Sequence, residues 1–113
     1  MKFNLSIAEE LDDAWRPIIE HQFNLTLSPL AASLIGPKVT FEAIEERHGL
    51  EYRCALKARL SNGTALELSS RHPEGRTAIC SVFMRARRDV TRRRRSRSGP
   101  VQISRRAAPS PLP

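Results

Sequence analysis

The segment between residues 51 and 69 constrains the fold of this chain more than any other. Apolar side chains occupy every second position of its first half, namely Tyr52, Cys54, Leu56, Ala58 and Leu60. This period of two is typical of a β-strand with one buried face. Asn62-Gly63 follows directly, and this dipeptide favours the two positive-φ positions of a type I′ turn. We therefore predict a hairpin in which residues 64–69 run antiparallel to residues 51–60.

Two other segments alternate in the same way. Residues 1–7 place Phe3, Leu5 and Ile7 on one side, and a further strand is predicted over residues 39–43, after the break at Gly36-Pro37.

Two segments have the three- and four-residue spacing of amphipathic helices. The first extends from Trp15 to Leu27, with Asp12 or Asp13 as its N-cap and Pro29 at its end. Residues 30–35 are expected to add one turn that packs on the core. The second follows a connector at residues 72–75 and lasts to about Arg94; its stripe is Ile79, Val82, Phe83, Ala86 and Val90.

The element order is thus β-α-β-β-β-α. Each helix has one apolar stripe, and both stripes must cover the apolar face of one sheet. We predict an α+β two-layer sandwich, with two helices on one face of a mostly antiparallel four-stranded sheet and a polar opposite face. Residues 1–95 form this domain. Residues 96–113 mix Ser, Arg, Ala and Pro without a period and are expected to be a disordered tail.

Charge is divided unevenly along the chain. Residues 1–75 carry 8 Lys and Arg against 11 Asp and Glu, whereas residues 76–113 carry 11 against 1, so the net charge changes from −3 to +10. Most of the excess belongs to one run at the end of the second helix: Arg85, Arg87, Arg88, Arg92, Arg93, Arg94, Arg95 and Arg97. Such a division favours a polyanionic partner, above all nucleic acid.

The helical spacing selects the arginines that could recognise a shape. Arg85, Arg88 and Arg92 follow one another at three- and four-residue steps outside the apolar stripe, and like charges so spaced repel unless phosphates neutralise them. The polar side of the third strand could extend this surface, although its charges could equally pair with Glu51 and Glu67. The predicted RNA-binding set is Arg85, Arg88, Arg92, Arg93, Arg94, Arg95, Arg53, Lys57 and Arg59. The plainer alternative is a solvated helix face with a solubilising tail.

Several other functions are not favoured by the sequence. No serine has the context of an activated nucleophile, there is no glycine-rich phosphate loop, and Glu45-Glu46-Arg47-His48 is typical of a polar turn, so we expect neither an enzyme nor a small-molecule substrate. Cys54 and Cys80 show no metal-ligand spacing with the three histidines, and no cofactor is expected. No segment approaches the length of a membrane helix, which predicts a soluble, cytoplasmic protein.

The order of elements and two short motifs resemble a known family. Phe3, Asn4 and Ser6 match in kind the first strand of the hibernation-promoting factor and ribosome-associated inhibitor family of bacterial proteins, which reads roughly Met-x-Ile-Asn-x-Thr. The family's last helix begins with Ala-Ile, found here as Ala78-Ile79. The resemblance spans about residues 1–95.

The rest of that helix both matches the family pattern and departs from it. Arg85 and Arg92 fall on lysine positions of the family, and Ala86 and Val90 on leucine positions. The departures are Cys80 for Asp, Asp89 for Gln, and Gly75-Arg76 where a Tyr is usual. The resemblance implies binding to ribosomal RNA in the mRNA and tRNA channel of the small ribosomal subunit, which blocks translation in resting or stressed cells. The alternative from charge alone is a regulatory module whose basic helix and tail dock an acidic protein.

Overall fold

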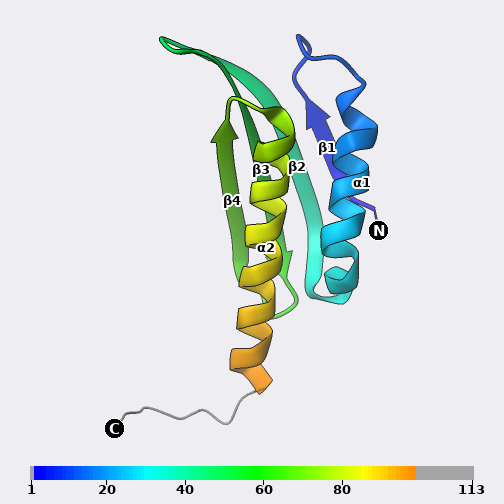
Figure 1. Ribbon diagram of the computed structural model, residues 1–113. Coiled ribbons are helices and arrows are strands. Elements are labelled where there is room, and N and C mark those ends of the chain that lie inside the picture. The colour runs from blue at the N-terminus through cyan, green and yellow to red at the C-terminus, as the bar shows by residue number, and fades with distance from the viewer. Residues whose placement is uncertain (1, 99–113) are drawn as a thin grey trace, which may run out of the picture.

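The computed structural model describes residues 2–98 of the 113-residue chain. Two long helices lie side by side on one face of a sheet, and the other face carries no helix in the described part of the chain (Figure 1). The elements are β1 (Asn4–Ile7), α1 (Trp15–Leu27), the short 3₁₀ helix η1 (Ser28–Ser33), β2 (Leu34–Glu46), β3 (Gly49–Leu60), β4 (Ala65–His72) and α2 (Gly75–Ser98). The predicted α+β sandwich and its element order are confirmed.

The sheet has the strand order β1-β2-β3-β4. β1 pairs in parallel with β2, while β2 with β3 and β3 with β4 are antiparallel. The parallel pair requires a crossover, and α1 supplies it as a β-α-β connection. Because the remaining strands follow one another as hairpins, the sheet is mostly antiparallel, as predicted.

The hydrophobic core lies between the sheet and the two helices. Every apolar residue predicted for the stripe of α2 is buried, and α1 contributes Ile19, Phe23 and Leu27. The Phe23 ring meets Phe83 of α2 edge-on at a centroid distance of 5.5 Å and stacks on Phe3 at 3.9 Å. This aromatic contact joins both helices to the N-terminal segment and fixes which face of α2 turns outward.

α2 begins in close contact with the start of α1. A Cβ atom placed on Gly75 would lie 2.4 Å from the tip of the Trp15 ring. The Trp15 ring also packs near Phe41 and Tyr52, at centroid distances of 4.9 and 5.4 Å. Only glycine can occupy the first position of α2 without displacing this ring.

Several predicted boundaries were wrong. β2 begins at Leu34, before the Gly36-Pro37 pair, because the chain passes these residues as an irregularity in the β2–β3 register between Ile35 and Lys38. Gly36 has a φ of 58°, which favours glycine, and Pro37 has no N–H to donate. The sequence predicted that these two residues would precede the strand, but the strand continues through them.

The β3–β4 hairpin is confirmed, but its turn is not the predicted type I′. The Gly63 N–H donates to the Leu60 carbonyl at 2.8 Å, and the Leu60 N–H donates to the Thr64 carbonyl at 2.8 Å. Ser61 and Asn62 thus occupy the centre of the turn, and Gly63 follows with a φ of 91°. This is the three-residue loop with a glycine bulge. The Thr64 N–H donates a hydrogen bond to the side-chain oxygen of Asn62 at 2.9 Å, and this bond stabilises the loop.

The helix ends also differ from the predictions. The N-cap of α1 is Ala14 without a side-chain cap, since the Asp12 carboxylate instead accepts the Ala14 N–H in the preceding turn. η1 occupies residues 28–33 instead of 30–35, and α2 continues to Ser98 instead of ending near Arg94. The first three residues of the predicted tail are therefore helical, and residues 99–113 lie outside the described part of the chain.

Candidate nucleic-acid interface

The basic half of α2 extends beyond the sheet. α2 runs back along β4 toward the β3–β4 turn, and its last turns pass the end of the strands (Figure 1). Among residues 75–93 of α2, Val90 is the last buried one. Arg93 continues the row of Ala86 and Val90 and is only partly exposed. Arg94 and Arg95 belong to the same projecting helix.

The three arginines predicted as principal contacts have different surroundings. Arg88 is exposed, and no hydrogen bond or ion pair ties it to another described residue. Arg92 is also exposed but pairs with Asp89, one turn before it, at 2.8 Å. Arg85 leans toward the sheet, where its Nη1 donates to the Ser69 carbonyl of β4 at 2.9 Å. Of the three, Arg88 is the least constrained.

Sequence reasoning left out one arginine that belongs to this surface. Arg87 is exposed and joins Arg88 and Arg92 around a shallow depression of about 520 Å³ on the outer side of α2, together with Met84 and Thr91. The sequence contained a signal for Arg87. Position 87 lies outside the apolar stripe, between the buried Ala86 and the outward Arg88, so its side chain could be expected to face outward. We call Arg87, Arg88, Arg92 and Arg93 the helix group.

A second basic cluster lies on the open face of the sheet. Lys57 of β3 stands opposite Lys38 of β2, and Arg59 lies two residues further along β3. These three side chains border a shallow depression of about 410 Å³, which Glu67, Ala65 and Ile35 also line. We call Lys38, Lys57 and Arg59 the sheet group. Lys38 was missed by sequence reasoning, although its place beside the inward Val39 already indicated the polar face.

Arg53, the third predicted residue of this face, is placed apart from the sheet group. Its Nη1 lies 3.2 Å from a carboxylate oxygen of Glu42. On the adjacent strand β4, directly opposite Arg53, Arg71 pairs with Glu46 and, at 3.2 Å, with Glu51, and these carboxylates raise the pKa of the Arg71 guanidinium. Two arginines thus face three glutamates, so this half of the open face is electrically compensated. From sequence, the basic residues of the third strand could pair with Glu51 and Glu67. In the structure Glu51 pairs with Arg71 of β4, and Glu67 stands opposite Lys57.

The helix group and the sheet group occupy the same end of the molecule but different layers. Arg59 pairs with Ala65 next to the β3–β4 turn, and the last turns of α2 pass that turn on the opposite side of the sheet. Guanidinium and ammonium groups at this end are suited to phosphate, which arginine can bind through two parallel hydrogen bonds. Positive charge therefore lies on both layers at this end of the molecule.

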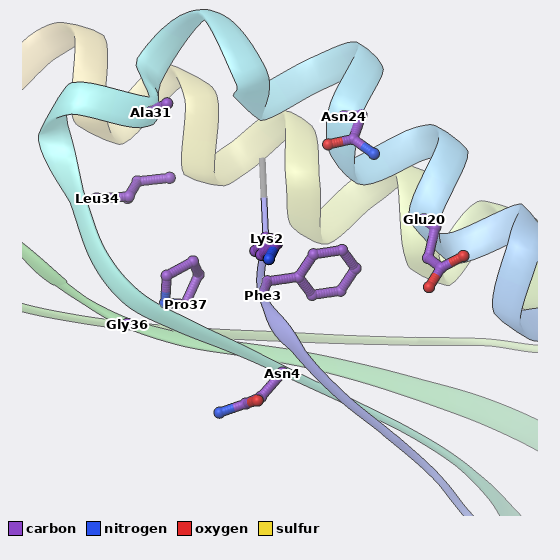
Figure 2. Close-up of a pocket in the computed structure, with 9 residues that line it drawn as sticks. All are labelled: Lys2, Phe3, Asn4, Glu20, Asn24, Ala31, Leu34, Gly36 and Pro37. Carbon is purple, nitrogen blue, oxygen red and sulfur yellow. The ribbon is translucent and has the colours of Figure 1, made fainter.

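A further depression lies on a different surface of the molecule. It has a volume of about 700 Å³ and lies between β1, α1, η1 and the irregular start of β2, and Phe3 is among the residues that line it (Figure 2). Its charged lining consists of Lys2 and Glu20, one of each sign. Beside this depression β1 begins to pair at Asn4, opposite Lys38, and the preceding Pro37 has no backbone N–H to donate.

Residues 2–98 contain no group of three or more His, Cys, Asp or Glu that could hold a metal ion. Within the same range no helix combines the length and apolar character that crossing a bilayer requires.

Comparison with known proteins shows likeness in structure. No protein-family model and no curated protein sequence matches this chain. A ribosomal subunit interface protein from Coxiella burnetii has a similar structure, with a TM-score of 0.68 and 9% identity over 83% of this chain and 98% of that one. The N-terminal domain of Protein Y from Thermus thermophilus has a TM-score of 0.59 and 16% identity over 81% and 98%. The chain therefore has the fold of these two proteins, which is the fold that the family resemblance implied.

Proposed function

We propose that this chain is a ribosome-associated, RNA-binding protein that occupies the mRNA and tRNA channel of the small ribosomal subunit and blocks translation in resting or stressed cells. One observation carries the proposal. The helix group and the sheet group gather at one end of a fold that is shared with a ribosomal subunit interface protein. Cytoplasmic localisation follows from such a partner.

The kind of RNA contact follows from which side chains are exposed. All six aromatic residues are buried or pack against the core, so they are not available as stacking platforms for bases. The basic side chains of both groups can reach phosphates, which carry no sequence information. Recognition would thus rest on backbone charge and on the shape of a structured RNA.

The two-layer placement of the charges favours a channel over a flat surface. The helix group and the sheet group lie on opposite layers of one end, so a flat partner could contact only one of them at a time. An RNA cavity that receives this end can contact both groups together. The proposed binding mode is therefore insertion of the basic end, with translation blocked because mRNA and tRNA need the same space.

The compensated arginines should matter less in this mode. Arg53 and Arg71 already have carboxylate partners, and a phosphate would have to compete with Glu42, Glu46 or Glu51 for them. Lys38, Lys57 and Arg59 face one glutamate, Glu67. We accordingly assign the contact to the sheet group and the helix group, with Arg94 and Arg95 as further charge in the same helix. Within the helix group, Arg92 would have to exchange Asp89 for a phosphate.

A competition experiment tests the channel directly. Purified bacterial small subunits, with and without bound mRNA and initiator tRNA, are incubated with the full-length chain at low salt and pelleted. The proposal expects the chain to pellet with empty subunits and to stay in the supernatant when the channel is filled. Equal pelleting with both would place the contact elsewhere on the subunit. Displacement from the subunits by an acidic protein, but not by ribosomal RNA, would favour the acidic-protein alternative.

A further inference from the structure

β4 is an edge strand with no strand partner on its outer side among the described residues. The Leu60 N–H bonds to the Thr64 carbonyl, and hydrogen-bonded pairs alternate with non-bonded pairs along an antiparallel ladder. The register then places Ala65, Glu67, Ser69 and Arg71 at non-bonded positions, where the backbone N–H and C=O point away from β3. Such an edge is a template for pairing with another strand.

One side chain covers the middle of this edge. Arg85 lies beside the buried Val82 and Ala86 on the flank of α2 that faces β4, and its Nη1 donates to the outward Ser69 carbonyl at 2.9 Å. The contact occupies a central acceptor of the edge and places a positive charge beside it. Charged side chains at such positions are a common protection of natural sheets against strand addition.

The edge is complementary to a second copy of itself. An antiparallel copy centred on Ser69 would place each Ser69 opposite its counterpart and each Glu67 opposite an Arg71. Opposite charges directly across a strand pair are favourable, and here Glu67 of one copy would join Glu46 and Glu51 of the other around its Arg71. The central pair needs the Ser69 carbonyl as an acceptor. That oxygen has a second lone pair, but the guanidinium of Arg85 bound to it takes the space that the partner strand would need. The two Arg85 side chains would also meet near the two-fold axis, where like charges repel.

We propose that the edge of β4 is a self-association surface for a second copy of this chain, and that Arg85 holds it closed through the Ser69 carbonyl. Ser69, Glu67 and Arg71 form the surface, and Arg85 is the residue that excludes the partner strand. The proposal does not depend on ribosome binding, because it rests on the sheet edge and on one contact between α2 and β4.

Solution mass of the purified full-length chain tests this proposal. Wild type, Arg85→Ala and Arg85→Met are compared by sedimentation equilibrium at equal concentration and moderate salt, with Arg88→Ala as the control that removes the same charge without touching the edge. Wild type and Arg88→Ala should have the mass of one chain, 12.8 kDa. Both Arg85 variants should shift toward twice that mass as concentration rises. The methionine keeps the packing of the arginine stem, and circular dichroism checks that each variant is folded.

A second substitution asks whether the dimer uses the proposed edge. Ser69→Pro removes an N–H that points away from β3, so the β3–β4 pairing remains but pairing with another strand is blocked. Added to Arg85→Met, it should restore the mass of one chain. Folded Arg85 variants that stay monomeric would overturn the proposal. A dimer that persists with Ser69→Pro would do so as well, and so would a wild-type chain that already dimerises.

Discussion

At the scale of single residues, what surrounds each arginine decides what it can do. Arg88 has no partner among the described residues, Arg92 has Asp89, Arg53 has Glu42, and Arg85 holds a backbone carbonyl. A phosphate contact with Arg88 would displace only water and counterions, whereas contact with Arg53 would also break an ion pair. The sequence shows where the arginines stand, but their partners depend on strand register and helix direction.

The first prediction compares two of these arginines. We expect Arg88→Ala to weaken binding to small subunits and to lower the magnitude of the slope of log affinity against log salt by roughly one unit or somewhat less. Arg53→Ala removes the same charge but leaves both basic groups intact, so its affinity and its slope should change less. Titration of each variant with purified subunits at several salt concentrations measures both. Equal losses would mean that net charge alone matters.

The second prediction concerns pH. Burial raises the pKa of the Cys54 thiol from 9.0 to about 12, because the thiolate would be desolvated in the core. Below pH 9 both the folded and the unfolded chain keep this proton. Between pH 9 and about 12 only the unfolded chain loses it, so the free energy of unfolding falls by at most about 1.4 kcal/mol per pH unit.

The variant Cys54→Ala isolates this effect. It should be less stable than wild type below pH 9, because it leaves a cavity in the core, but its stability should decline less as the pH rises. Urea unfolding of both proteins, below pH 9 and about one unit above it, measures the difference. Cys80→Ala, at a partly exposed thiol, serves as the control. Parallel declines of wild type and Cys54→Ala would contradict the assigned cause.

At the scale of elements, alternation and helical spacing were reliable wherever burial alone decides the outcome. The stripe of α2 is buried as predicted, and the third strand has the predicted inward face. The predictions were wrong where backbone hydrogen bonds determine the turn type or the start of a strand. Asn62-Gly63 is compatible with two turn types, and only the loop length selects between them. β2 crosses Gly36-Pro37 because its pairing with β3 continues on both sides of the irregularity.

The third prediction sets helix propensity against packing. At the first position of α2, Gly75→Ala places a more helix-favouring residue, but the new Cβ would lie 2.4 Å from the Trp15 ring. Overpacking of this kind typically costs about 1–3 kcal/mol. We expect lower stability in chemical denaturation and a changed Trp15 fluorescence. Arg76→Ala, at the exposed next position, should have little effect. A stabilised Gly75→Ala would show that propensity prevails.

At the scale of the whole molecule, the proposed function rests on the layer order and the basic end together. The sequence predicted the sandwich and the basic helix, because both follow from periodicity and charge along the chain. It did not predict that Lys38 stands beside Lys57, or that Arg53 belongs to a compensated half of the sheet, because these depend on pairing between distant segments. The two-sided basic end is therefore a property of the fold.

The fourth prediction separates the folded domain from the residues after it. Removal of residues 99–113, which include Arg105 and Arg106, should weaken binding to small subunits without abolishing it. Both basic groups remain in the shortened chain, and only general attraction is lost. Complete loss of binding in a truncated chain that keeps its circular dichroism spectrum would place recognition in the removed segment.

Association with ribosomes in the cell tests the central claim most directly. Lysate from resting cells is sedimented through a low-salt sucrose gradient, and the chain is detected across the fractions. Wild type should comigrate with small subunits or whole ribosomes, whereas a folded variant with Arg87, Arg88, Lys38 and Lys57 changed to alanine should remain at the top. A wild-type chain that stays at the top, or a variant that comigrates as wild type does, would contradict the account.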